Sequence, residues 1–256
     1  MPAHAAKFYR GAPYQHPQEN EAFRHLCSAG AAFPASSGDV RIIGNIACNN
    51  CPPIDALVLG PCSITIVDFK DYGGTIQVIE DADWRTSKGV TVKGGSYDNP
   101  YCQVRGYKLA LIRWLETNGL LQDADLGHIS GLVIFTQPVS INNAMGPKSK
   151  KWFAATDFLG GTTFLRDRAS SKLKLSSNCM DRIIDHLGVK PFELRQSERL
   201  VPSSMIEKAK RDAEFATMQD LDDERMAKWE VENRARIQEQ CDEAFRQQYF
   251  PDSHTK

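Results

Sequence analysis

Two aspartates and a lysine, Asp55, Asp68 and Lys70, form the arrangement in this sequence that is best suited to chemistry. Asp68 and Lys70 stand two positions apart at the end of an apolar run, so on a β-strand their side chains point to the same face. Asp55 begins the preceding apolar run, and the short link Gly60-Pro61-Cys62 between the two runs predicts a β-hairpin. Such a hairpin would place Asp55 beside Asp68.

Two carboxylates in a poorly solvated place repel each other unless a cation lies between them. Carboxylate oxygens suit Mg²⁺ or Mn²⁺, and such an ion can polarise a phosphodiester and lower the pKa of a bound water. Lys70 could orient that water, help to deprotonate it, or stabilise developing negative charge. An Asp-x-Lys triplet by itself is more often a pair of solvated charges at a strand end, so its surroundings decide the interpretation.

Those surroundings resemble the nuclease-related domain, or NERD, family. The resemblance begins with the segment IDALVLGPCSITIVDFKDYGG, which ends at Gly74, and continues with Trp84 and the helix start Asn99-Pro100-Tyr101-Cys102-Gln103. An N-terminal helix with glutamates, Glu19-Asn20-Glu21-Ala22-Phe23, precedes them. The resemblance covers about residues 17–135 and extends more weakly to about residue 190. It implies a PD-(D/E)xK, restriction-endonuclease-like fold and a metal-dependent DNA nuclease, found alone or fused to helicases, kinases or other DNA-processing domains.

The resemblance also implies roles for individual residues. Asp55 and Asp68 would be the metal carboxylates, Lys70 the catalytic lysine, and Gln103 a helix residue that points to the site. The family more often has Glu at the position of Asp68. A glutamate from the first helix would complete the site.

Glu19 and Glu21 are both candidates for that glutamate. They point in different directions on a helix, so only one of them can reach the site. The spacing of Glu19 from the apolar residues Phe23 and Leu26 favours Glu19 slightly.

The pattern of apolar residues predicts an α/β domain with one mixed sheet. The expected helices cover residues 19–27, 99–116 and 176–187, and the expected strands cover 40–46, 54–59, 63–69, 75–79, 90–93 and 132–136. Asn99 should cap the second helix with Pro100 at its first position, and Gly188 should end the third. With the resemblance, these elements predict a restriction-endonuclease-like mixed sheet flanked by helices.

The domain boundary is expected near Pro202. Residues 1–16 are interpreted as an N-terminal arm and residues 17–202 as the nuclease-like domain. Residues 203–250 contain twelve acidic and eight basic residues and no glycine, which predicts a charged helical extension. Residues 251–256 should fray. The extension could bind a partner protein or a second copy of the chain.

A basic zone lies between residues 148 and 174, where seven basic residues face two acidic ones. Its loop-like composition fits either a phosphate-contacting surface or a solvated lysine-rich loop, and the sequence leaves both open. The candidates for contact with nucleic acid are Lys148, Lys150, Lys151, Arg166 and Arg168.

Composition excludes several other classes of protein. The 256 residues include 31 Lys and Arg against 32 Asp and Glu, which rules out a wholly basic binder. No apolar run reaches the length of a membrane span, and the N-terminus lacks the apolar region of a signal peptide, so we expect a cytoplasmic protein without a membrane anchor. Cys48-x-x-Cys51 offers a weaker zinc or redox interpretation, because no second such pair exists.

The sequence therefore predicts a deoxyribonuclease that depends on Mg²⁺ or Mn²⁺ and serves in DNA processing or in defence against foreign DNA. The alternative is a non-catalytic module that binds nucleic acid, or acts as a scaffold, and recruits a partner through the helical tail. DNA is the expected substrate, and a helicase, a kinase or another DNA-processing protein is the expected partner or fused domain.

Overall fold

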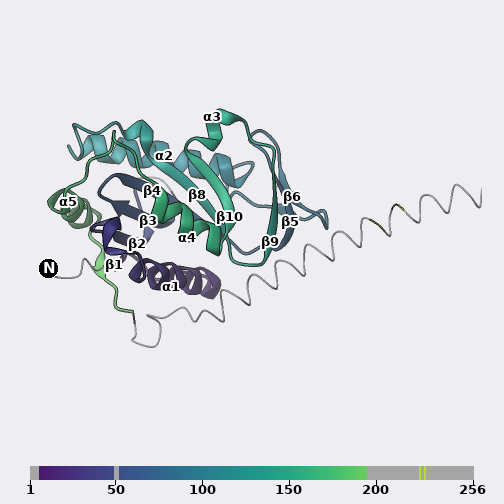
Figure 1. Cartoon of the computed structure of the whole chain (residues 1–256), viewed down its shortest axis with the longest axis horizontal. Coiled ribbons are helices and arrows are strands. Elements are labelled where there is room, and N and C mark those ends of the chain that lie inside the picture. Colours follow the sequence, from purple (N-terminus) through teal and green to yellow (C-terminus); the bar gives the residue numbers. More distant parts are fainter. Residues whose placement is uncertain (1–5, 49–51, 195–224, 226–227, 229–256) are drawn as a thin grey trace, which may run out of the picture.

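The computed structural model describes residues 6–48 and 52–194, and residues 225 and 228 in the C-terminal part of the chain. These residues form an α/β fold with a seven-stranded sheet, a four-stranded sheet, and helices packed on the larger sheet (Figure 1). The predicted mixed sheet flanked by helices, of the restriction-endonuclease-like kind, is confirmed.

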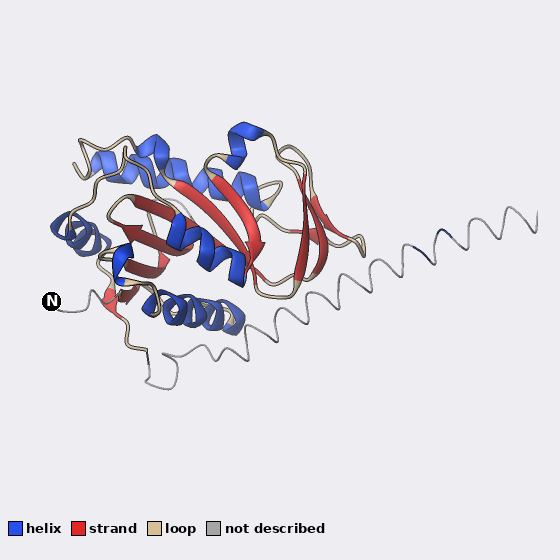
Figure 2. Cartoon of the chain, in the orientation of Figure 1, coloured by secondary structure: helices blue, strands red, loops and turns tan. Residues whose placement is uncertain are grey.

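The larger sheet is mixed in strand direction (Figure 2). In spatial order it contains β10 (Phe153–Asp157), β8 (Ser130–Phe135), β4 (Ser63–Lys70), β3 (Ile54–Gly60), β2 (Arg41–Ile46), β1 (Lys7–Arg10) and β11 (Lys190–Pro191). The central β3 is antiparallel to both of its neighbours, β2 and β4, and β8 and β10 run parallel to β4. The predicted hairpin of β3 and β4 is confirmed.

Helices cover both faces of the larger sheet. The helices α2 (Pro100–Thr117) and α5 (Ser177–Leu187) share an apolar core with Leu57 and Ile66, whereas α1 (Pro17–Ala31) and α4 (Phe158–Asp167) share another with Ala56 and Val67. Because side chains alternate along a strand, Asp68 and Lys70 lie on the same face as Ile66, which is the face that α2 covers. The alternation thus directs both polar side chains toward α2.

The smaller sheet contains β7 (Thr91–Val92), β6 (Trp84–Thr86), β5 (Gly74–Val78) and β9 (Val139–Asn143). Its strands lie beyond the ends of β4 and β8 in the chain, to the right in Figure 1. Residues 75–79 and 90–93 were expected to form strands of the same sheet as β3 and β4, and that prediction was wrong. The chain leaves the larger sheet at residues 71–73, where Gly73 and Gly74 break the extended run and Gly74 has a φ of +85°.

The chain leaves β4 and β8 at paired positions and enters the smaller sheet from both strands. They remain paired up to Lys70 and Phe135, and their continuations β5 and β9 are paired again from Gly74 and Val139. Between these pairs, the Asp71 carboxylate accepts hydrogen bonds from the Thr136 hydroxyl at 2.7 Å and the Gln137 amide at 2.8 Å. The double bend fixes the end of β4, and with it Lys70, at the junction of the two sheets.

The helix boundaries agree with the predicted capping residues. The side chain of Asn99 accepts a hydrogen bond from the Cys102 backbone amide at 2.8 Å, and Pro100 opens α2. Gly188 ends α5 in the left-handed conformation. None of the helices in the described part of the chain has the length and apolarity that crossing a bilayer requires.

Several elements were not predicted. Residues 7–10 of the expected N-terminal arm form β1, which lies between β2 and β11 near one edge of the larger sheet and pairs with both. The basic zone contains α3 (Pro147–Lys150), β10 and α4, so its loop-like interpretation was wrong. Residues 35–37 and 126–128 form short 3₁₀ helices. Arg225 and Lys228 are helical and exposed, while the rest of the predicted extension and tail lies outside the described residues.

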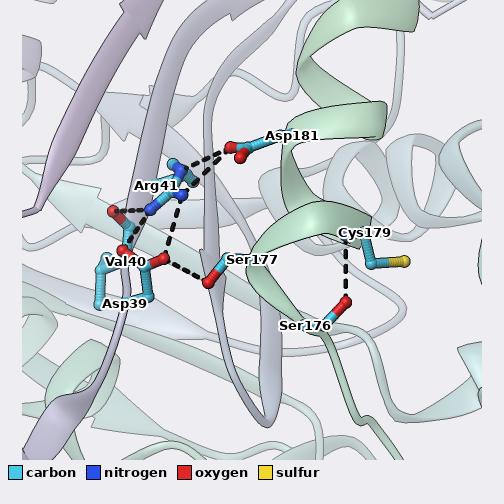
Figure 3. Close-up of polar contacts among 7 residues, drawn as sticks. All are labelled: Asp39, Val40, Arg41, Ser176, Ser177, Cys179 and Asp181. Carbon is cyan, nitrogen blue, oxygen red and sulfur yellow. Dashed lines mark hydrogen bonds and ion pairs between the residues drawn. The ribbon is translucent and has the colours of Figure 1, made fainter.

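A buried arginine anchors α5 to the larger sheet (Figure 3). The side chain of Arg41 on β2 is fully buried and forms ion pairs with Asp39 and with Asp181 of α5. The hydroxyl of Ser177 donates a hydrogen bond of 2.6 Å to Asp39, which ties the first turn of α5 to the same cluster. The guanidinium is thus paired with carboxylates from two separate segments.

We expect that deleting residues 203–256 leaves a folded domain with the candidate site intact. The apolar core and the site lie within residues 6–194, and the deleted segment has too few apolar residues to form a core of its own. Circular dichroism, a thermal melt and sizing of the 1–202 fragment beside the full chain would test this. An unfolded or aggregated fragment would contradict it, while a changed oligomeric state would assign assembly to the extension.

Candidate active site

Asp55, Asp68 and Lys70 lie together where the larger sheet meets the smaller one. The antiparallel register of β3 and β4 pairs Ala56 with Val67, so Asp55 and Asp68 are the next cross-strand neighbours. Asp68 is 1% exposed, the side chain of Lys70 is 11% exposed, and Asp55 is half-buried. Two carboxylates and one ammonium group therefore share a poorly solvated place.

Asp55 is held in position by a backbone amide. Its Oδ2 accepts a hydrogen bond of 2.7 Å from the Phe69 N–H on the neighbouring strand. Burial and the nearby Asp68 carboxylate raise the pKa of Asp55 well above its usual value, against the opposing effect of the Phe69 amide and of Lys70. Burial and the charge of Asp68 thus disfavour the ionised form of Asp55 unless more positive charge is supplied.

Lys70 links Asp68 to α2. Its Nζ lies 3.2 Å from Asp68 Oδ1 and 3.0 Å from Oδ2, and it donates a hydrogen bond of 2.9 Å to Gln103 Oε1. Burial disfavours the charged lysine, but the Asp68 and Asp55 carboxylates outweigh it, so the pKa of Lys70 is raised and the side chain is cationic at neutral pH.

Gln103 is fixed on its other side. Its Nε2 donates a hydrogen bond of 2.6 Å to the hydroxyl of Tyr107, one turn further along α2. Since a lysine ammonium can only donate, the contact with Lys70 sets the orientation of the Gln103 amide. The helix start that the sequence predicted at Asn99 and Pro100 thereby brings Gln103 to Lys70.

The structure separates the two candidate glutamates of α1. Glu19 is half-buried and interacts electrostatically with Lys70 and with Asp68, and burial raises its pKa. Glu21 is exposed. The geometry therefore brings Glu19 toward the two aspartates, whereas Glu21 faces solvent.

Tyr14 belongs to this site and was not predicted from the sequence. Its hydroxyl donates a hydrogen bond of 2.6 Å to the backbone carbonyl of Asp55, and its ring packs against Phe23 of α1. Burial, followed by the charge of Asp55, raises the pKa of Tyr14 strongly, so it stays protonated as a donor. No motif marks Tyr14, because its contact joins segments far apart in the sequence.

The donor set fits a hard divalent cation. Within the described residues, Asp68 Oδ2 stands out as a buried side-chain oxygen that receives no hydrogen bond, although Lys70 Nζ lies near it. The described residues contain no group of three or more His, Cys, Asp or Glu side chains placed to hold a metal. Two carboxylates, with the remaining positions filled by water and substrate oxygens, match the way in which Mg²⁺ is usually held.

The predicted nucleic-acid contacts are not gathered around the two aspartates. Lys70 of β4 pairs with Phe135, the last residue of β8. The first residue of β10 pairs with Gly131, near the start of β8. Lys148, Lys150 and Lys151 precede β10 and are exposed, so they lie toward the other end of these parallel strands.

The two predicted arginines differ from each other. Arg166 is exposed and is paired with Asp167 at 2.7 Å. Arg168 is half-buried and donates hydrogen bonds to Ser130 Oγ, at 2.7 Å, and to the carbonyl of Lys151. Only Arg168 therefore joins the lysines that precede β10.

The weaker zinc or redox interpretation gains no support from the described residues. Cys48, two residues after the end of β2, is buried, and Cys51 lies outside the described residues.

Residues 18–136 match the family model described as a nuclease-related domain, NERD. The matched segment contains Glu19, Asp55, Asp68, Lys70 and Gln103. Neither the curated proteins nor the solved structures provide a match. The resemblance predicted from the sequence is confirmed.

Proposed function

Because the chain carries a nuclease-related domain over residues 18–136, we propose that it hydrolyses phosphodiester bonds of DNA with a bound Mg²⁺ or Mn²⁺ ion. The observation that carries this proposal is the pair of cross-strand carboxylates, Asp55 and Asp68, with an Asp68 oxygen that receives no hydrogen bond and with Lys70 beside it. A divalent cation would offset the burial that raises the pKa of both aspartates, and the charge of Asp68 that raises the pKa of Asp55 further.

In the proposed mechanism, Asp55 and Asp68 hold the metal ion. A metal ion bound there supplies Lewis acidity to a phosphate oxygen and lowers the pKa of a coordinated water. The Phe69 amide and the Tyr14 hydroxyl keep Asp55 and its backbone in place, which preserves the geometry for in-line attack by water.

Lys70 acts as a cation in this proposal. Without a bound metal, the Asp68 and Asp55 carboxylates raise the pKa of Lys70 and favour its charged form, so we assign it no part in proton abstraction. The ammonium group, fixed between Asp68 and Gln103, would instead position the attacking water and stabilise the negative charge that develops on the phosphate. Glu19 would approach from α1 to complete the site.

We propose DNA processing or defence against foreign DNA in the cytoplasm as the setting. A helicase, a kinase or another DNA-processing protein could act with this domain, and the C-terminal extension could serve partner binding or self-assembly. The composition of residues 203–250, rich in charge and without glycine, supports that use of the extension.

Cleavage assays with the Lys70→Ala variant test the proposed function. The full chain is incubated with linear and with circular DNA, in Mg²⁺, in Mn²⁺ or in EDTA. We expect metal-dependent cleavage that the variant loses, while Lys88→Ala, an exposed lysine of the β6–β7 hairpin, keeps it. Intact DNA after incubation of the wild-type chain with either metal would contradict catalysis and favour the non-catalytic scaffold.

A further inference from the structure

Two cations meet beside Trp152, on the α2 side of the larger sheet. The Nζ of Lys108 lies 4.6 Å from the centre of the Trp152 ring and donates a hydrogen bond of 2.7 Å to the Gly127 carbonyl. Arg168 is bonded to the carbonyl of Lys151, the residue before Trp152. Burial, followed by the charge of Arg168, lowers the pKa of Lys108 to about 8. Both side chains are therefore held in place close to like charge.

Aromatic contacts connect a further cation, Arg105, to this pair. The ring of Tyr101 packs against that of Trp152 at 5.5 Å and carries Arg105 at 5.9 Å from its centre. The Tyr101 hydroxyl also bonds to Ser149 Oγ at 2.9 Å, within the short helix α3. We call the set the α2–β10 basic surface, and it consists of Arg105, Lys108, Lys148, Lys150, Lys151 and Arg168.

The α2–β10 basic surface is poorly neutralised by the protein itself. Within the part of the chain that the structure describes, none of its six cations forms an ion pair. Among the nearby carboxylates, Asp125 interacts electrostatically with Lys108, accepts from the Gly127 amide and lies near His128, and Glu80 accepts from the Gly146 amide at the start of α3. A surface on which cations outnumber the nearby carboxylates attracts a polyanion.

The surface lies within reach of a nucleic acid at the candidate active site. Lys108 stands five residues after Gln103 on α2, which is about 7.5 Å along the helix axis. Lys70 and Lys151 lie toward opposite ends of the paired strands β4, β8 and β10, a separation of roughly 20 Å. Duplex DNA carries a negative charge for about every 1.7 Å of its length, so a bound duplex would present many phosphates over that span.

We propose that the α2–β10 basic surface binds the sugar–phosphate backbone of nucleic acid beside the segment that is cut, without reading its bases. The choice of nucleic acid, rather than an acidic protein, rests on the proposed nuclease function and on Arg105 and Lys108, which lie on the same helix as Gln103. Compared with the zone predicted from the sequence, the surface gains Arg105 and Lys108 and loses Arg166, whose charge is paired with Asp167. Contacts to phosphate alone give affinity without sequence preference.

The salt dependence of binding tests this proposal. The triple variant Arg105→Ala, Lys148→Ala and Lys151→Ala changes three exposed residues, and binding of a 24-base-pair duplex to the full chain is measured by fluorescence anisotropy in EDTA over a range of NaCl concentrations. We expect the slope of log affinity against log salt to become shallower by about 2 to 3 units, since each lost phosphate contact removes about 0.9 unit. The matched control, Lys7→Ala, Arg182→Ala and Lys190→Ala, removes the same charge from the region of β1, α5 and β11 and should leave the slope unchanged.

Four outcomes would overturn the proposal. An unchanged slope in the first variant, an equal change in the control, or no binding by the wild-type chain would show that the surface does not hold nucleic acid. Displacement of the duplex by polyglutamate at equal charge concentration would show a general site for acidic ligands. Because EDTA prevents metal-dependent cleavage, a shallower slope in a chain that never cuts DNA would reject the proposed function and keep this inference.

Discussion

The Asp68→Asn variant is expected to lose metal-dependent cleavage by more than about 100-fold, because outer contacts of metal ligands alone contribute 10- to 100-fold. Asp68 is buried, lies opposite Asp55, and has an oxygen that receives no hydrogen bond within the described residues. An amide has the size of the carboxylate but is a poor ligand for a hard cation. Cleavage rates over a titration of Mg²⁺ and of Mn²⁺ measure the loss.

Two control variants make this result specific. Asp68→Glu keeps a carboxylate at this position and introduces the residue that the resemblance implies is more common there. We expect this variant to retain metal-dependent cleavage. Glu21→Gln removes an exposed carboxylate of α1 and should not change the rate. Wild-type cleavage by Asp68→Asn in Mg²⁺ would reject the assignment of Asp68 as a metal ligand.

The Asp68→Asn variant should remain folded in EDTA, and its stability should depend less on pH than that of the wild type. The raised pKa values of Asp55 and Asp68 mean that folding favours their protonated forms. Their contribution to stability is therefore full below the unfolded-state pKa, about 3.9, and is lost as the pH rises through the folded-state pKa. Since Asp68 is one cause of the raised pKa of Asp55, thermal melts in EDTA between pH 4 and pH 8 should show a smaller loss of stability in Asp68→Asn.

Removal of both carboxylates that face Arg41 should destabilise the fold by about 3 kcal/mol, and by more than removal of Arg41 itself. In the double variant Asp39→Asn and Asp181→Asn, the fully buried guanidinium would keep its charge without a counter-charge. In Arg41→Met, the two aspartates would remain, but their side chains are 22% and 46% exposed and can be hydrated. Urea unfolding of the three proteins at pH 7 measures the difference.

The pH dependence provides a second measurement on this cluster. The hydrogen bond from Arg41 lowers the pKa of Asp39 to about 2. The stability from Asp39 is therefore present above its unfolded-state pKa and is lost as the pH falls toward 2, so the double variant and the wild type should converge in acid. A double variant that is as stable as the wild type at pH 7, or less affected than Arg41→Met, would contradict the anchoring role of the buried arginine.

The sequence by itself determined the features that depend on neighbours along the chain. Alternation of side chains and a short turn were sufficient to predict that Asp55, Asp68 and Lys70 meet on a hairpin. The capping residue Asn99, followed by Pro100, was sufficient to place the start of the helix that carries Gln103. These signals are local, since a strand period, a tight turn and a helix cap are set by a few consecutive residues.

Only the tertiary structure decided which distant residues share a place and which are exposed. It brought Glu19 toward Asp68 and left Glu21 in solvent, added Tyr14 to Asp55, and turned β4 and β8 together into a second sheet. It also placed Lys108 next to Arg168, although 60 positions separate them in the chain. The physical reason is that burial and the pairing of charges arise when separate segments pack together, and no short stretch of sequence records which segments will meet.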